Sequence, residues 1–176
     1  MRVAVFGGSF NPPHLGHAMV AAWVRWADRA DEVWFTPTLQ HAFDKSLAPW
    51  SARAAACEEL AALLGGWASV CRIEAELPVP SYTVRTLDAL AARHADVEFR
   101  LVLGADAWEQ RAGWHQWSRI EKVYSPIVVG RGARPGLDAP AFPDLSSTEV
   151  RRRLAAGEPV DAWVPARVLS AWSDRP

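Results

Sequence analysis

The sequence predicts a single α/β domain, in which a parallel sheet of about five strands carries helices on both faces. The chain has 176 residues, a usual length for one domain. Short runs rich in β-branched and aromatic residues alternate along it with longer segments of helical periodicity, and this alternation is typical of parallel sheets. Because no repeat and no linker divides the chain into halves, we expect residues 1–176 to fold as one unit.

The expected strands are short segments in which Val, Ile, Phe or Trp recur between turn-forming residues. The first leads directly into two glycines, and the last precedes a Pro- and Gly-rich stretch at residues 131–143. We expect that stretch to be one long surface loop. The predicted strands cover residues 2–6, 32–37, 69–74, 97–103 and 125–130.

Helical periodicity occupies the segments between and after the strands. In the first helix Leu15, Met19, Trp23 and Trp26 recur at spacings of four, four and three, so we expect this stripe to pack on the sheet. The fourth helix is interrupted near Gly113. The predicted helices cover residues 15–29, 51–64, 82–94, 107–122, 146–156 and 165–172.

The composition argues against several classes of protein. A formal net charge of −1 argues against nucleic-acid binding, because such surfaces neutralise many phosphates. The apolar runs are shorter than the roughly 20 residues of a membrane span, and the amino-terminal segment is too short for a secretory signal. We therefore expect a cytoplasmic protein without a membrane partner, in which Cys57 and Cys71 are free thiols.

The most informative segment joins the first strand to the first helix and reads GGSFNPPHLGH over residues 7–17. Gly7 and Gly8 allow the backbone to approach a ligand, and a helix start presents unpaired N–H groups with positive dipole character. His14 and His17 are three positions apart, so both imidazoles can face one point above the strand ends. This combination predicts a phosphate site.

Other interpretations of this loop have less support. One histidine could cap the helix while the other is exposed, without any ligand. A zinc site needs a third ligand, and none follows at a supporting spacing. The loop also lacks the third glycine of the dinucleotide fingerprint and the Gly-Lys-Ser/Thr ending of the P-loop.

Residues 7–17 resemble the GxFxPxHxGH signature of the HxGH nucleotidyltransferase superfamily, and residues 145–151 (LSSTEVR) resemble its second signature, ISxTxIR. Residues 80–87 (PSYTVRTL) and the turn Gly104-Ala105-Asp106 are similar to elements of bacterial nicotinate-nucleotide adenylyltransferases. These matches span most of the chain. The resemblance implies a Rossmann-like nucleotidyltransferase domain over residues 1–176.

The second signature also has a physical interpretation. Ser146 and Glu149 can form a capping box at the start of a helix, and Thr148 and Arg151 then lie on one helical face. Arg151 could reach a triphosphate, whereas we expect Arg152 and Arg153 to form a solvated basic face.

The resemblance implies roles for individual residues. His14, His17 and Arg151 are the expected catalytic residues. The expected contacts to ATP are Gly7, Gly8, Ser9, Phe10, Gly16, Gly104, Asp106, Ser147 and Thr148. The expected acceptor pocket contains Ser81, Tyr82, Thr83, Trp114 and His115, with Trp114 stacked on a pyridine ring. Lys45 is added to this pocket on separate grounds, given below.

Two segments depart from the narrower family. The loop after the second strand reads TLQHAFDK over residues 38–45 instead of the usual PPHK/R element, and His115 and Arg85 replace commoner residues. Lys45 is one of only two lysines beside seventeen arginines, so we expect its compact ammonium to contact phosphate, the alternative being an exposed side chain.

The resulting hypothesis is transfer of the adenylyl group of ATP to nicotinate mononucleotide, with Mg²⁺ carried by the ATP. Nicotinamide mononucleotide or phosphopantetheine is an alternative acceptor, because the first loop is shared across these families. A nucleotide-binding module without catalysis is a second alternative. The sequence leaves the oligomeric state and the choice between acid and amide open.

Overall fold

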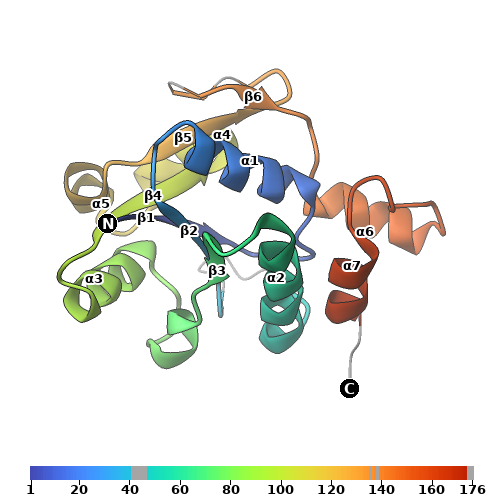
Figure 1. Cartoon of the computed structure of the whole chain (residues 1–176), viewed down its shortest axis with the longest axis horizontal. Coiled ribbons are helices and arrows are strands. Elements are labelled where there is room, and N and C mark those ends of the chain that lie inside the picture. Colours follow the sequence, from blue (N-terminus) through green and yellow to red (C-terminus); the bar gives the residue numbers. More distant parts are fainter. Residues whose placement is uncertain (41–46, 135, 138, 174–176) are drawn as a thin grey trace.

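The computed structural model describes residues 1–40, 47–134, 136–137 and 139–173. In this part of the chain a sheet lies between two layers of helices (Figure 1). The strands are β1 (Arg2–Gly8), β2 (Glu32–Pro37), β3 (Ala68–Val70), β4 (Glu98–Gly104), β5 (Ile127–Arg131) and β6 (Ala141–Phe142). The helices are α1 (Leu15–Trp26), α2 (Trp50–Leu64), α3 (Thr83–Arg93), α4 (Ala105–Glu109), α5 (Trp117–Tyr124), α6 (Ser147–Ala155) and α7 (Ala166–Ser173), with short 3-10 helices η1 (Ile73–Glu76) and η2 (Arg111–Gly113).

All paired strands run parallel, in the order β3-β2-β1-β4-β5-β6. The order reverses between β1 and β4, which lie side by side at the centre of the sheet. Gly8 at the end of β1 is paired in register with Pro37 at the end of β2. A crevice for ligands forms outside the carboxyl ends of the strands at such a switch point, so the loop after β1 lies at its centre.

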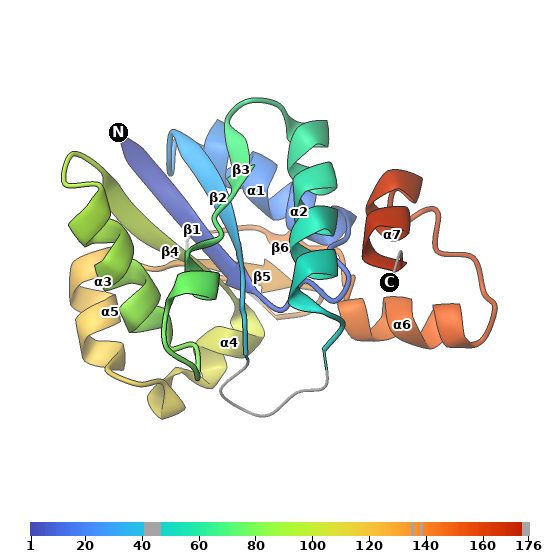
Figure 2. The same ribbon diagram turned by 90° about the horizontal axis from the view of Figure 1, so that it is seen from below.

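The two faces of the sheet bury alternate residues of each strand. In β1, Ala4 and Phe6 face the core under α1 and α2, whereas Val3 and Val5 face the core under α3 and α5. Figure 2 shows these two pairs of helices on opposite sides of the strands. The expected α/β domain with both faces of a parallel sheet covered is confirmed.

The carboxy-terminal helices extend the layer that holds α1 and α2. Figure 2 shows α7 beside α2, with α6 leading to it from the edge of the molecule. The side chains of Val168 and Trp172 in α7 and of Val150 in α6 are buried in the same core as α1 and α2. None of the helices in the described part of the chain combines the length and apolar character that a membrane crossing needs.

The sheet differs from the expected one at both edges. The prediction that residues 131–143 are loop throughout is wrong, because Ala141–Phe142 forms the sixth strand, beside β5. The predicted strand 69–74 is also too long, since β3 ends at Val70 and η1 follows. The η1 turn directs Glu74 inward, where its carboxylate accepts a hydrogen bond of 2.6 Å from the Thr86 hydroxyl.

The stripe expected to pack α1 on the sheet is only partly confirmed. Trp26 is 75% exposed, and small or β-branched residues face the sheet instead, among them Ala18, Ala21 and Val24. Small side chains allow the helix axis to approach the strands closely. Trp23 is half-buried and lies edge-on to Phe142 of β6.

The remaining expectations about helices and thiols hold with small changes. The break expected near Gly113 is confirmed, because α4, η2 and α5 replace one continuous helix. Gln116 before α5 has a φ of 55°, a left-handed conformation that separates the pieces. Cys57 and Cys71 are free, as expected.

Candidate active site

The two histidines of the first loop lie together at the start of α1. Their ring centroids are 3.8 Å apart, and the backbone N–H of His14 donates to Nδ1 of His17 over 3.1 Å. The rings of Phe6 and Phe10 pack against the His17 ring. The buried Phe10 ring, 2% exposed, thus supports His17 from within the core.

Burial keeps both imidazoles neutral near pH 7. It lowers the pKa of His14 to about 4, with a smaller contribution from the Arg131 charge. Burial also lowers the pKa of His17 well below its ordinary value, and His14 and Arg131 add to this effect. Because Nδ1 of His17 accepts a hydrogen bond, the neutral ring carries its proton on Nε2. His17 therefore offers an N–H donor to a ligand.

Two glycines of the loop lie in close contact with rings of the protein. A Cβ on Gly16 would lie 2.9 Å from the His14 ring, so the histidine can pack there only against glycine. A Cβ on Gly8 would lie 3.2 Å from the Phe10 ring. The expectation that Gly8 serves ligand approach is thus incomplete, because its absent side chain also makes room for Phe10.

Some of the backbone N–H groups at the start of α1 form hydrogen bonds within the protein. The Leu15 N–H donates to the carbonyl of Trp163 over 2.8 Å, and the His14 N–H donates to His17. These two groups do not point to a ligand, contrary to the expectation for a phosphate held by the helix start.

Helix α6 brings Arg151 to this loop. The Ser146 hydroxyl accepts from the Glu149 N–H over 3.1 Å and caps the helix, while the Ser147 hydroxyl donates to the Pro12 carbonyl over 2.8 Å. Arg151 donates from Nη1 to the Asn11 carbonyl over 2.6 Å and from Nη2 to the Thr148 hydroxyl over 3.4 Å.

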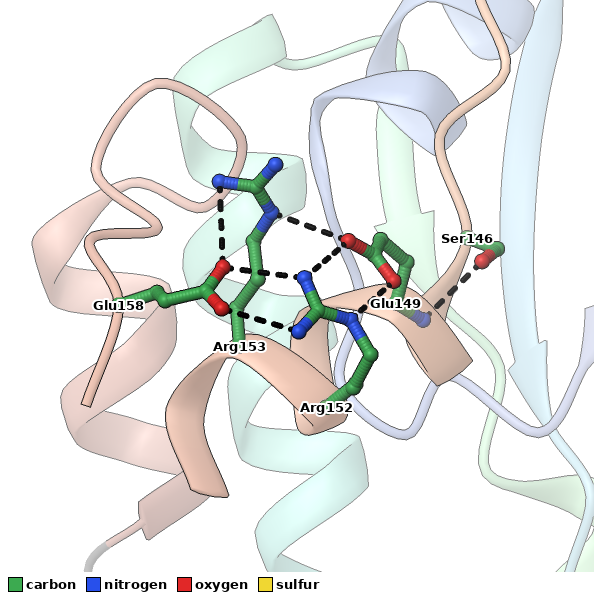
Figure 3. Close-up of polar contacts among 5 residues, drawn as sticks. All are labelled: Ser146, Glu149, Arg152, Arg153 and Glu158. Atoms are coloured by element: carbon green, nitrogen blue, oxygen red, sulfur yellow. Dashed lines mark hydrogen bonds and ion pairs between the residues drawn. The ribbon is translucent and has the colours of Figure 1, made fainter. Parts of the chain in front are cut away.

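The charges on α6 separate Arg151 from its two neighbours. Arg152 and Arg153 form ion pairs with Glu149 and Glu158 (Figure 3). The carboxylate of Glu149 is therefore used by arginines and does not complete the expected capping box. Among the described residues, no carboxylate forms an ion pair with Arg151, so its positive charge remains available to an anion.

Asp106 at the start of α4 holds two further arginines. Its carboxylate oxygens form ion pairs with Arg131 at the end of β5 and with Arg134. Asp106, Arg131 and His17 line the same cavity as Arg151. A ligand that bonds to Asp106 must share it with these guanidinium groups.

The residues of the expected acceptor pocket lie on the other side of the strand ends from Arg151. Tyr82 stacks on His115 with ring centroids 4.7 Å apart, and the Arg85 guanidinium lies 4.8 Å from the centroid of the Tyr82 ring. Trp114 stands edge-on to Trp117. Ser81, Tyr82, Thr83, Trp114 and His115 line one cavity of about 380 Å³.

Three cavities adjoin along the strand ends. The cavity of about 380 Å³ contains Gly7, Gly8 and the residues around Trp114. A second of about 200 Å³ lies beside His14 and Gly16, and a third of about 640 Å³ beside Thr148 and Arg151. Ser9 lines the first and third, Gly104 the first and second, and His17, Asp106 and Ser147 the second and third.

One expected site residue lies outside this description. Lys45 belongs to residues 41–46, which are not among the described residues, so its contact with phosphate stays a prediction. Among the described residues, no group of three or more His, Cys, Asp or Glu side chains is arranged to hold a metal ion.

The sequence interpretation missed Arg53, which is 1% exposed in α2. Its guanidinium donates to the carbonyls of Ala48, Ser9 and Leu39 over 2.9, 2.8 and 3.4 Å. Burial lowers its pKa, but an arginine stays charged in proteins. Its isolation within the alanine-rich run SARAAAC was the available signal. Arg131 and Arg134 were also missed, because the Pro- and Gly-rich stretch was interpreted as loop.

Comparison with known proteins gives a family model and close relatives. The model described as cytidylyltransferase-like matches residues 5–153. A protein of Anaeromyxobacter sp. (strain K), named "Probable nicotinate-nucleotide adenylyltransferase", is 46% identical, covering 96% of this chain and 91% of that protein. A protein of the same name from Myxococcus xanthus (strain DK1622) is 39% identical, covering 97% and 90%.

A solved structure shares the fold. The Plasmodium falciparum nicotinic acid mononucleotide adenylyltransferase complexed with NaAD superposes with a TM-score of 0.76 at 16% identity. The match covers 97% of this chain and 93% of that one. It agrees with the expected Rossmann-like fold.

Proposed function

Since the chain belongs to the cytidylyltransferase-like family and, by its relatives, to the nicotinate-nucleotide adenylyltransferases, we propose that it transfers the adenylyl group of ATP to nicotinate mononucleotide. The products are deamido-NAD and pyrophosphate. The observation that carries the proposal is the line of adjoining cavities at the strand ends. These have aromatic and hydroxyl side chains at one end and the uncompensated Arg151 at the other.

The reaction needs positioning and charge neutralisation more than proton transfer. A 5'-phosphate oxygen of nicotinate mononucleotide attacks the α-phosphorus of ATP in line, the new P–O bond forms, and the bond to the bridging oxygen breaks. The electron pair leaves with pyrophosphate. Because the nucleophile is already an anion, no general base is required.

The roles of the residues follow from their charges and donors. His17 donates Nε2–H to the α-phosphate, and His14 lies behind it in the same hydrogen-bonded pair. Arg151 binds the leaving pyrophosphate, and Arg131, which is paired with Asp106, lines the same cavity. Mg²⁺ would enter as part of the substrate MgATP and would neutralise part of the charge on its phosphates. Fixed donors of this kind stabilise charge that develops in the transition state.

Residues around the first cavity hold the acceptor. Trp114 stacks on the pyridine ring, and Ser81, Tyr82, Thr83 and His115 surround it. Ser9, Gly104, Ser147 and Thr148 line the second and third cavities, in which ATP lies. Gly7 and Gly8 line the first cavity, beside the acceptor. On this proposal Phe10 and Gly16 act by packing against His17 and His14.

An acceptor panel tests the proposed function. The protein is mixed with MgATP and, separately, nicotinate mononucleotide, nicotinamide mononucleotide and phosphopantetheine, and pyrophosphate release is measured. We expect release to be fastest with nicotinate mononucleotide. Faster turnover with another acceptor would show that this acceptor, and not nicotinate mononucleotide, is the substrate. Binding of MgATP without turnover of any acceptor would favour a nucleotide-binding module without catalysis.

A further inference from the structure

Asn11 in the first loop joins three separate parts of the chain. Its side chain is buried, and Oδ1 accepts hydrogen bonds from the indole N–H of Trp172 over 3.0 Å and from the Ala48 N–H over 3.3 Å. Its backbone carbonyl accepts from Arg151 over 2.6 Å. The orientation of this one residue therefore depends on α7, on the segment before α2 and on α6.

The bond between Trp172 and Asn11 crosses 161 positions of sequence and is shielded from water. The indole N–H is the only donor of the Trp172 side chain, and a buried donor that loses its acceptor is costly. The rest of the Trp172 ring packs in the core shared by α1 and α2. Helix α7 is thus held firmly enough to fix Asn11 from behind.

The same carboxy-terminal region contacts the loop at two more points. The Trp163 carbonyl accepts from the Leu15 N–H, and the Ser147 hydroxyl donates to the Pro12 carbonyl, each over 2.8 Å. The loop between β1 and α1 is therefore held from the carboxy-terminal side along its whole second half.

Arg151 depends on this arrangement. Its guanidinium has no carboxylate partner among the described residues, and its shortest contact is the Asn11 carbonyl. A shift of that carbonyl would turn the guanidinium relative to His17 and Asp106, which line the same cavity. A misplacement of about 1 Å can cost a large part of the catalytic advantage of a positioned group.

We propose that Asn11 and Trp172 are positioning residues, in which the indole of α7 holds Asn11 and the Asn11 carbonyl directs Arg151 toward the polyphosphate of ATP. This inference rests on the proposed function, because it assigns the polyphosphate to Arg151. Both residues act through Arg151 and not on the reacting atoms.

The first test is Trp172→Phe, which removes the N–H and keeps most of the ring. We expect kcat/KM for MgATP to fall about tenfold, the value of one buried hydrogen bond, while KM for nicotinate mononucleotide stays nearly constant. Trp34→Phe is the matched control. It removes an indole bond of 2.9 Å to Glu32, away from the loop, and should leave both substrate parameters unchanged.

The second test replaces the acceptor. Asn11→Asp keeps an oxygen at the position of Oδ1 and should retain activity within a few-fold. Asn11→Leu removes the acceptor of both Trp172 and Ala48 and should lose at least as much activity as Trp172→Phe. If the pair acts as one unit, the double variant Asn11→Leu/Trp172→Phe should be no worse than Asn11→Leu. These two Asn11 variants carry the test if Trp172→Phe does not fold.

Calorimetric titration with MgATP separates this inference from the proposed function. If the wild type turns over no acceptor, the proposed function fails, yet weaker MgATP binding by Trp172→Phe than by Trp34→Phe would still support the positioning role. The inference is overturned if both tryptophan variants bind MgATP alike. The inference is also overturned if Trp172→Phe lowers only kcat, by the same factor as its fraction of folded protein, while both KM values stay constant.

Discussion

At the scale of single residues, the charge balance of neighbouring side chains distinguishes Arg151 from the two arginines that follow it. Arg151, Arg152 and Arg153 are consecutive on α6, but the last two are neutralised by Glu149 and Glu158. The sequence motif singled out Arg151. The ion pairs give the physical reason, because a guanidinium without a carboxylate is the one that gains most from a phosphate.

The first prediction compares Arg151→Ala with Arg152→Ala. We expect the first to lower kcat/KM for MgATP about 100-fold or more, because on the proposed function it removes the charge that stabilises the leaving pyrophosphate. The second should change it by less than about threefold, since Arg153 still pairs with both glutamates and exposed ion pairs contribute little. Steady-state pyrophosphate release measures both. Equal losses would show that Arg151 has no special role.

At the scale of elements, the loops at the strand ends are joined by buried polar groups from helices behind them. Arg53 of α2 binds the carbonyl of Ser9 after β1 and that of Leu39 after β2. Glu74 in η1 accepts from the N–H of Leu39 over 3.3 Å. Arg53 thus binds the carbonyl of Leu39, and Glu74 binds its N–H. These two bonds connect the loop after β2 to helices on both faces of the sheet.

This arrangement predicts that Arg53→Met is strongly destabilising. The change leaves three half-buried backbone carbonyls without their donor, so we expect the free energy of unfolding to fall by about 3 kcal/mol. Arg93→Met is the matched control, because it breaks an exposed ion pair with Glu76 and should cost less than about 1 kcal/mol. Urea denaturation followed by circular dichroism measures both. Similar midpoints would contradict the role given to Arg53.

At the scale of the whole molecule, burial of the histidine pair couples folding to pH. Unfolding restores an ordinary pKa of about 6.5 to His14, whereas in the folded protein burial lowers it to about 4. Between these values the unfolded chain binds the extra proton, so the stability contributed by neutral His14 is complete above about pH 6.5 and is lost as the pH falls toward 4. The half-buried His17, whose pKa is also lowered, acts in the same direction.

The corresponding measurement is the free energy of unfolding from pH 4 to pH 8. We expect it to decrease on acidification below about pH 6.5, with up to about 3 kcal/mol of the decrease due to His14. His14→Gln should reduce that slope, and His94→Gln, which removes an exposed histidine, should leave it unchanged. A His14→Gln slope equal to that of the wild type would mean that His14 titrates alike in both states.

The order of strands and helices, the loop with its two histidines and Arg151 on a late helix could be predicted from the sequence alone. These features follow local rules of periodicity, helix starts and motif spacing. The tertiary structure alone decided which α1 residues face the sheet, that β6 joins β5, that Arg53 is buried, and that Asn11 contacts Trp172. The reason is physical: these features depend on partners far away in sequence, and a residue's spacing from its neighbours carries no information about such partners.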